Sequence, residues 1–176
     1  MSSGQTSGTT WKEVAFRRIT TDDDLRAVGR LSAEIWSEHY TPLIGRPQVD
    51  YMLGKFLSLE ALRKQVADGY EYYLVEEARR PIGYFAFQLR EGCELFLSKY
   101  YVEKSRRRKG YGRRVMDLLV ETARRHGARR IALTVNKGNT VALSVYKRLG
   151  FRNAGALVTD IGNGFVMDDY RLERDV

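Results

Sequence analysis

The sequence predicts an α/β fold in which helices cover both faces of a mixed, largely antiparallel sheet of about seven strands. Three observations carry this prediction. Short runs rich in aromatic and β-branched residues recur along the chain, and longer amphipathic segments lie between some of them. In addition, 43% of the 176 residues are hydrophobic, which is enough for one well-packed domain over residues 12–176. The predicted order of elements is βααβββαβαββ.

The N-terminal part of the chain is predicted to form one strand followed by a helical layer. The first helix has Thr21 as its start signal, acidic residues in its first turn and apolar residues at helical spacing. Pro42 and the Gly45-Arg46-Pro47 turn interrupt this pattern before it resumes. The expected elements are a strand at residues 14–19, a helix at 21–40, and two shorter helices at 49–57 and 59–68.

The rest of the chain is predicted to complete the sheet. A meander of three strands comes first, and its middle strand is apolar at both alternations, as in a strand covered on both faces. The third meander strand, a helix and the next strand are expected to form a parallel crossover, and Gly162-Asn163-Gly164 is expected to turn a closing hairpin. The expected bounds are strands at 72–77, 81–89, 94–102 and 130–135, helices from 112 to about 127 and at 140–149, and hairpin strands at 151–161 and 165–172.

Composition narrows the class of protein. Residues 1–11 are small and polar, so we expect them to form a flexible tail. Cys93 is the only cysteine, which excludes an internal disulfide and a thiolate zinc cluster, so we predict no metal site and a cytoplasmic location. No apolar run approaches the roughly 18 residues of a membrane span, so no membrane association is predicted. The net charge of +8 favours an anionic partner without specifying which anion.

The most charged stretch of the chain is RRRKGYGRR, at residues 106–114, between a predicted strand and a predicted helix. Its glycines let backbone amides approach a ligand closely, and a helix N-terminus favours anions. Cations crowded at this positive helix end repel one another and the helix dipole, and a bound anion relieves that repulsion. A loop that holds phosphate, a nucleic-acid patch and a plain solvated charge run are the three interpretations.

Two motifs resemble a known family. Arg107 to Gly112 fits the pattern RxxGxG, and NTVALSVYKRLGF, from Asn139 to Phe151, fits NxxAxxxYxxxGF. Together, at this distance and in this strand and helix context, they resemble the GNAT superfamily of acetyl-CoA-dependent N-acyltransferases, over about residues 12–174. The resemblance implies acetyl-CoA as co-substrate and direct acetyl transfer to a free amine, with no covalent enzyme intermediate. A nucleic-acid module is less favoured, because neither stacking aromatics nor a docking motif is placed to serve one.

The resemblance also implies which residues bind the cofactor. Loop amides from Arg108 to Arg113 would hold the pyrophosphate, and strand amides near Val102 would pair with the pantetheine arm, with the Val102 amide polarising the carbonyl. Asn139 would hold the cofactor's amide groups, cap its helix, or do both. The predicted cofactor-binding residues are Tyr100, Tyr101, Val102, Arg107, Arg108, Lys109, Gly110, Tyr111, Gly112, Arg113, Asn139 and Tyr146.

Tyr146 is the predicted acid that protonates the leaving thiolate, since it lies seven residues after Asn139, on nearly the same helix face. A packed core tyrosine is the alternative. The general base is open. Strand alternation places the following residues on one face: Glu94, Phe96, Ser98 and Tyr100. Several family members have a glutamate partway along this strand, where this chain has Phe96 and Ser98, so we expect a water relayed from Glu94 or Ser98, or deprotonation by bulk solvent.

The acceptor groove of the family implies further candidates in the first helical segment and the closing hairpin. Glu34 and His39 are alternative bases, whereas Cys93 has no obvious base beside it and is a poor nucleophile. Four acidic residues in these segments suit a cationic amine: Glu34, Glu38, Asp168 and Asp169. The chain also resembles an unassigned bacterial branch near the polyamine acetyltransferases, so a small polyamine is the predicted acceptor. The predicted substrate-binding residues are Glu34, His39, Tyr40 and Asp168.

Other functions stay open. A protein N-terminus or a lysine is the second acceptor class, and a non-catalytic CoA-binding or nucleic-acid-binding protein is the rival outside enzymes. Aromatic residues near Tyr51 and Phe56 allow a homodimer contact.

Overall fold

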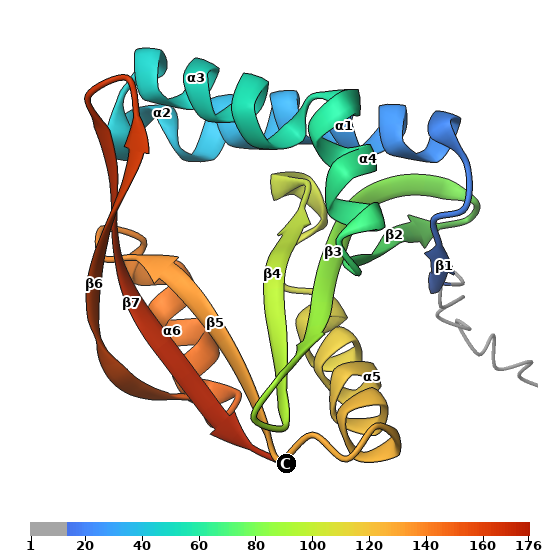
Figure 1. Ribbon diagram of the computed structural model, residues 1–176. Helices are drawn as coiled ribbons and strands as arrows, with labels where there is room; N and C mark the ends of the chain where they lie inside the picture. The colour runs from blue at the N-terminus through green and yellow to red at the C-terminus, as the bar shows by residue number, and fades with distance from the viewer. Residues whose placement is uncertain (1–13) are drawn as a thin grey trace, which may run out of the picture.

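The computed structural model describes residues 14–176, so the predicted tail at residues 1–11 lies outside the described residues. Seven strands form one sheet in the order β1-β2-β3-β4-β5-β7-β6 (Figure 1). The strands are β1 (Val14–Arg18), β2 (Glu71–Glu77), β3 (Arg80–Arg90), β4 (Glu94–Val102), β5 (Arg130–Asn136), β6 (Arg152–Gly162) and β7 (Phe165–Asp175). The helices are α1 (Asp22–His39), α2 (Thr41–Ile44), α3 (Arg46–Leu57), α4 (Leu59–Ala67), α5 (Tyr111–Arg125) and α6 (Thr140–Arg148), with a 3₁₀ turn at Lys104–Arg106.

The predicted fold class is confirmed. All neighbouring strands pair antiparallel except β4 and β5, which are parallel and connected through α5. One short helix was not expected: α2 occupies residues that were interpreted as a break at Pro42. Proline is tolerated in the first turn of a helix, where its missing N–H would have no partner anyway, so it starts α2 and, as Pro47, α3.

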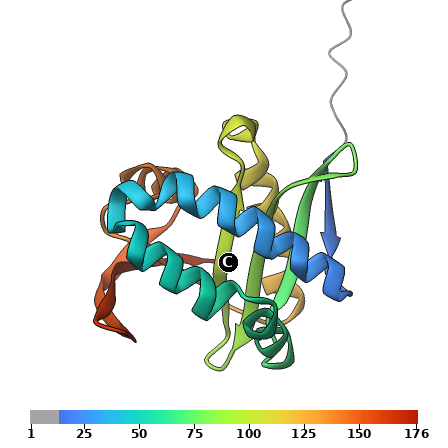
Figure 2. The same ribbon diagram turned by 90° about the horizontal axis from the view of Figure 1, so that it is seen from above.

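The helices form two layers, one on each face of the sheet. On one face, α1, α3 and α4 pack over a core that includes Leu62 and Tyr84 (Figure 2). On the other face, α5 and α6 pack over a core that includes Leu119 and Ile131. Residues of β3 alternate between the two cores, as predicted for a strand covered on both faces. Within residues 14–176, no helix is both long and apolar enough to cross a membrane.

The sheet splits in its middle. β4 and β5 pair at three positions only, from Glu94 opposite Arg130 to Phe96 opposite Ala132. Beyond Phe96 the two strands diverge, and Figure 1 shows the resulting gap between a first arm, β1 to β4, and a second arm, β5 to β7. The edge of β4 from Leu97 to Val102 therefore has no strand partner on the side facing β5.

The second arm reaches the helical layer at its tip. The hydroxyl of Tyr51 on α3 donates to the carbonyl of Ile161 at 2.6 Å, and the Gln48 amide donates to the carbonyl of Val166 at 2.6 Å. The hairpin turns at Asn163 and Gly164, both with positive φ, which is the two-residue geometry that asparagine and glycine favour. These contacts close the wide end of the gap.

A β-bulge in β4 reverses the alternation of its side chains. Ala86 on β3 pairs with Lys99 and Phe87 pairs with Leu97, which leaves Ser98 as an extra residue. As a result, Leu97 and Tyr100 both face the core under α5, although regular alternation would place them on opposite faces of the strand. The expectation that Ser98 and Tyr100 share a face is therefore wrong, because one inserted residue shifts every later side chain to the other face.

Candidate active site

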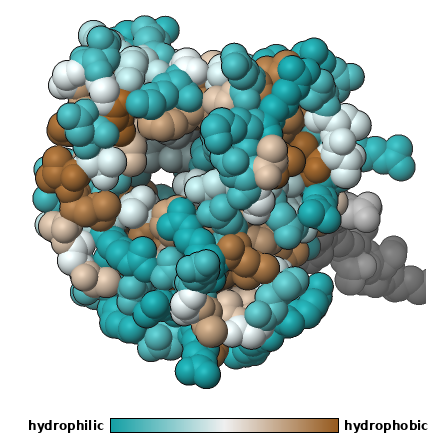
Figure 3. Space-filling view, in the orientation of Figure 1, coloured by the Kyte–Doolittle hydropathy of each residue, from teal (hydrophilic) through white to brown (hydrophobic). Residues whose placement is uncertain are grey.

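A cavity of about 1020 Å³ occupies the split between the two arms. Figure 3 shows the surface hollowed between the arms in this orientation. Its walls come from α1, α3 and α4 on one side, β4 and the start of α5 at the centre, and β5, α6 and β7 on the other. Most predicted cofactor-binding residues line it: Tyr100, Tyr101, Val102, Arg107, Arg108, Gly110, Tyr111, Gly112, Arg113, Asn139 and Tyr146.

The loop before α5 presents a row of unpaired backbone amides. Arg108 and Gly110 both have positive φ, and Gly110 is the N-cap of α5 with no side-chain hydrogen bond to the cap. In residues 14–176, none of the N–H groups from 108 to 113 donates a hydrogen bond to the protein, and the first paired amide is that of Arg114, to Gly110. Such a row at the positive end of a helix is suited to bind a phosphate or diphosphate.

Buried Glu77 at the end of β2 holds this loop in place. Its carboxylate lies 2.6 Å from the Arg106 guanidinium and 3.6 Å from the Lys109 ammonium, and it accepts a hydrogen bond of 2.7 Å from the Tyr111 hydroxyl. Lys109 does not line the cavity, so its predicted role in contacting the cofactor is not supported for the side chain. Part of the charge run therefore has a structural function that the sequence did not reveal.

Glu77→Gln is expected to loosen the loop. The amide cannot compensate the charges of Arg106 and Lys109, so we expect a melting temperature lower by several degrees and CoA binding weakened by about tenfold. Differential scanning fluorimetry and a CoA titration measure both quantities. Glu121→Gln is the control, since among residues 14–176 Glu121 pairs only with Arg125, on the exposed face of α5. A variant with unchanged melting temperature and CoA affinity would show that Glu77 does not position the loop.

Arg107 also supports the site from within. Its Nε donates a hydrogen bond of 3.1 Å to the carbonyl of Val102, which ties the loop to the free end of β4. The phenol of Tyr100 lies over the first turn of α5, close enough that a Cβ placed at Gly112 would stand 3.4 Å from its oxygen. Arg107 and Tyr100 thus connect the loop and the first turn of α5 to the free edge of β4.

A cluster of tyrosines lies at the far end of β4. The hydroxyls of Tyr40 and Tyr101 are 3.4 Å apart, and the Tyr101 ring packs against Trp36. Tyr146 on α6 faces this cluster, and burial together with the neighbouring phenols of Tyr100 and Tyr40 raises its pKa above the ordinary value. Tyr146 therefore keeps its proton at neutral pH and can donate it.

Asn139 joins α6 to the end of α1. Its side-chain oxygen accepts from the amide of Ala142 at 3.2 Å, so the predicted helix cap is present. The same side chain interacts with His39 and Tyr40. Burial and the charge of Arg107 lower the pKa of His39, so the imidazole is neutral at neutral pH.

Two adjacent aspartates on β7 have different surroundings. Asp168 is half-exposed and pairs with Lys137 at 2.5 Å, and it does not line the cavity. Asp169 is buried and lines the cavity, and its carboxylate has no hydrogen bond or ion pair with any described residue. Burial and the nearby charge of Asp168 raise the pKa of Asp169 to about 6. The prediction of Asp168 as a substrate residue is thus not supported, and Asp169 is the member of the pair that lines the cavity.

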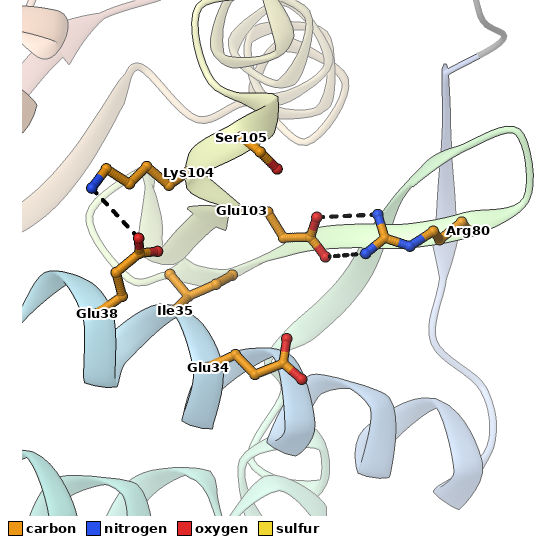
Figure 4. A pocket seen from close by; sticks show the side chains of 7 residues that line it. All are labelled: Glu34, Ile35, Glu38, Arg80, Glu103, Lys104 and Ser105. Carbon is orange, nitrogen blue, oxygen red and sulfur yellow. Dashed lines mark hydrogen bonds and ion pairs between the residues drawn. The ribbon is translucent and has the colours of Figure 1, made fainter.

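Two other predicted residues lie away from the cavity. Glu94 is buried at the opposite end of β4, where it pairs with Arg130 at 3.1 Å and Arg171 at 2.5 Å, so it cannot serve as the base. Glu34 lies in a separate hollow on α1, beside the Glu38–Lys104 ion pair (Figure 4). Ser98, His39 and Tyr40 do line the cavity.

Sequence reasoning missed two further cavity residues, Lys99 and Gln65. The Lys99 ammonium donates to Gln65 Oε1 at 2.8 Å and to the Ser98 hydroxyl at 3.1 Å. Burial lowers the pKa of Lys99 to about 8. A lysine in an aromatic strand was the available signal, but the bulge that turns it into the cavity has no mark in the sequence.

A split sheet, a row of free amides at a helix N-terminus and a protonated phenol at the end of the split define a group-transfer enzyme with a phosphate-bearing donor. Residues 31–151, more than half of the chain, match the model of the acetyltransferase (GNAT) family. The chain belongs to this family. A search of curated proteins gave no significant match.

Solved structures show the same fold. PaiA N-acetyltransferase from Thermoplasma acidophilum, in complex with coenzyme A, has a TM-score of 0.77 at 17% identity, covering 93% of this chain and 99% of that one. Ribosomal-protein-alanine N-acetyltransferase from Brucella melitensis has a TM-score of 0.66 at 21% identity, covering 92% and 99%. A Bacillus subtilis acetyltransferase in complex with CoA has a TM-score of 0.60 at 18% identity, covering 93% and 99%.

Proposed function

We propose that this protein transfers the acetyl group of acetyl-CoA directly to the nitrogen of a primary amine. Acetyl-CoA is the co-substrate, as predicted from the sequence. The observation that carries the proposal is the continuous path formed by the free amides at residues 108–113, the unpaired edge of β4 and the phenol of Tyr146. A cytoplasmic location stays a prediction.

The donor end of the cavity fits coenzyme A. Amides of the loop would hold the pyrophosphate, with Arg108 and Arg113 beside them for the phosphates of the nucleotide end. The edge of β4 near Tyr101 would hydrogen-bond the pantetheine amides as an added strand does. Acetyl-CoA supplies an activated acetyl thioester at the position where the arms diverge.

Asp169 and Tyr146 divide the proton transfers between them in this proposal. The ammonium of the acceptor gives a proton to the Asp169 carboxylate, and the amine lone pair then forms the C–N bond as the C–S bond breaks. Tyr146 donates a hydrogen bond and then its proton to the departing sulfur. The proton that the new amide nitrogen loses restores the Tyr146 phenol, and Asp169 returns the first proton to solvent, so the products are the amide and the CoA thiol. Both side chains line the cavity together with Tyr40. Burial and the Tyr40 phenol raise the pKa of Tyr146, and burial and the charge of Asp169 raise the pKa of Tyr40.

The cavity fits an acceptor with a single ammonium better than a polyamine, which carries two or more. Of the four acids that suggested a polyamine, only Asp169 lines the cavity. Glu34 and Glu38 lie in the separate hollow, and Asp168 pairs with Lys137. One carboxylate suffices for one ammonium. A second ammonium of a polyamine has no described acid to meet it except Asp68, which pairs with Lys64.

Reversing the charge at the start of α5 tests the donor site. Arg113→Glu is expected to weaken CoA binding by about ten- to a hundredfold. A carboxylate at this position repels the phosphate groups of CoA, including the diphosphate bound at the helix N-terminus. Arg124→Glu makes the same charge change at the other end of α5, away from the cavity, and CoA affinity should be nearly unchanged. Isothermal titration with CoA gives both values.

The same titration separates the enzyme from a nucleic-acid binder. Tight DNA binding at physiological salt, together with no CoA binding, would overturn the proposed function. Equal loss of CoA affinity in Arg113→Glu and Arg124→Glu would mean that CoA responds only to net charge.

A further inference from the structure

Lys99 is a partly buried cation with no carboxylate partner in the described part of the chain. Its ammonium lies 2.8 Å from Gln65 Oε1 and 3.1 Å from the Ser98 hydroxyl, and its Nζ is 5.7 Å and 5.5 Å from the ring centres of Tyr70 and Tyr72. These neighbours stabilise the ammonium without neutralising its charge. A buried charge left without a counter-ion is costly, so its presence in a cavity calls for a reason.

The surroundings of Lys99 are fixed. The Gln65 amide nitrogen donates to the carbonyl of Phe56 at 2.7 Å, and its oxygen also accepts from the Tyr72 hydroxyl at 2.6 Å. This double attachment orients the amide oxygen toward Lys99. The bulge at Ser98 turns the lysine out of the core under α5 and toward this group. Two irregular features, a bulge and a locked glutamine, thus place one ammonium in the cavity wall.

Other basic residues of this part of the cavity already have partners. Lys64 pairs with Asp68 at 2.7 Å, and Lys55 donates to the carbonyl of Ile161. Of the three lysines that line the cavity, Lys99 is the one whose charge meets neither a carboxylate nor a backbone carbonyl oxygen among the described residues. Lys99 is therefore available to an anion that enters this part of the cavity, away from the arginines of the loop before α5.

Lys99 on β4 and Asp169 on β7 place two opposite charges in the part of the cavity beyond the CoA-binding loop, here called the acceptor side. Lys99 is two residues before Tyr101 on β4, about 7 Å along the strand, and the Tyr101 hydroxyl contacts that of Tyr40. Tyr40 lines the same cavity as Asp169 and Tyr146, where the amine is proposed to react, and burial together with the charge of Asp169 raises the pKa of Tyr40. Lys99 is thus set apart from the position where the amine is proposed to react by about two residues of β4.

We propose that the acetyl acceptor carries a carboxylate separated from its primary amine by several carbon atoms, and that Lys99 binds this carboxylate. The inference rests on the proposed function. An amino acid of this kind replaces the polyamine predicted from the sequence. The second ammonium of a polyamine would face the ammonium of Lys99, and like charges in a cavity repel. An α-amino acid fits less well, because its amine and carboxylate are adjacent.

Three acceptors with one chain length test the proposal: hexylamine, ω-aminohexanoic acid and hexamethylenediamine. They share the reacting amine and differ only at the far end, which is a methyl, a carboxylate or a second ammonium. With acetyl-CoA and thiol release as the readout, kcat/KM for the amino acid should exceed that for either amine by about tenfold or more. A preference for the diamine overturns the inference and leaves the proposed function intact.

Variants of Lys99 locate the effect. Lys99→Met should remove the preference by lowering kcat/KM for the amino acid about tenfold, with hexylamine unchanged, whereas Lys99→Arg should keep most of it. Lys147→Met, on the exposed side of α6, is the control. Equal loss on all three acceptors in both Lys99 variants would mean that Lys99 acts as a base or in folding, and would overturn the inference.

A binding measurement covers the case in which none of the three is acetylated. Hexanoate, a carboxylate without an amine, should bind the complex of the wild-type protein with CoA and should not bind that of Lys99→Met. Calorimetry detects this without turnover. No binding to the wild-type complex overturns the inference, whereas failure of every amine in a wider panel, including peptides, would overturn the proposed function.

Discussion

Tyr146→Phe is expected to lower kcat by about a hundredfold or more while CoA binds with unchanged affinity. The reason is that the phenylalanine keeps the ring, including its edge contact with Phe151 at 5.4 Å between centroids, and removes only the hydroxyl. Without that proton donor the departing thiolate leaves unprotonated, and general acids typically contribute a factor of this size. Steady-state kinetics with a saturating amine, together with a CoA titration, measures both quantities.

A matched control separates catalysis from packing. Tyr170 is a half-buried tyrosine on β7 that does not line the cavity, and Tyr170→Phe should leave kcat within about twofold. A normal kcat in Tyr146→Phe would remove Tyr146 from the mechanism and favour the alternative of a packed core tyrosine. A loss of both kcat and CoA affinity would indicate that the hydroxyl binds the cofactor.

Asp169→Asn is expected to lower kcat/KM by about a hundredfold and to stabilise the protein at neutral pH. The amide has nearly the shape of the carboxylate but cannot accept the proton of the ammonium. In the wild-type protein the same argument predicts that kcat/KM rises with pH through about 6, where the Asp169 carboxyl ionises. This lower limb of the pH profile should be missing in Asp169→Asn.

The stability effect has a defined pH range. Burial raises the pKa of Asp169 from 3.8 to about 6, so the folded state binds this proton more tightly than the unfolded state does. The resulting stabilisation is complete below pH about 4 and is lost as the pH rises through about 6. At pH 7 the ionised, unpaired carboxylate therefore costs free energy, up to about 3 kcal/mol, which the asparagine avoids. Thermal melts at pH 4 and pH 7 check this: the variant should melt higher at pH 7 only.

Asp168→Asn is the control for both measurements. Asp168 pairs with Lys137 outside the cavity, and surface pairs of this kind contribute little to stability. The melting temperature and kcat/KM above pH 7 should change little, whereas the lower limb of the pH profile should move to lower pH, because the charge of Asp168 no longer raises the pKa of Asp169. If Asp168→Asn lost as much activity as Asp169→Asn, the field of both carboxylates rather than one base would be acting on the acceptor.

Local sequence patterns were sufficient for the elements of the fold. The strand from Glu94 to Val102 has the predicted bounds, and most of the other predicted elements end within a few residues of the observed ones. Residue type and period depend on neighbours in the chain, so they can be interpreted without tertiary information. The loop and the helix of the two motifs were predicted for the same reason, because their residues are close in sequence.

The acceptor side depended on contacts between distant segments. Period-two alternation places Asp168 and Asp169 on opposite faces of a strand but does not say which face lines the cavity. The bulge at Ser98 depends on how β4 pairs with β3, and it alone brings Lys99 to Gln65. Glu94 is the opposite case, a predicted site residue that distant contacts remove from the site. Its carboxylate pairs with Arg130 on β5 and Arg171 on β7.

The sequence by itself determined that this chain forms a mixed α/β sheet with an anion-binding loop and a tyrosine-bearing helix, because both motifs are contiguous and carry their own local geometry. Only the tertiary structure decided which acid, which lysine and which face of β4 meet the acceptor. Those choices follow from strand pairing and from burial between segments that lie far apart in the chain, and a one-residue change of register reverses them.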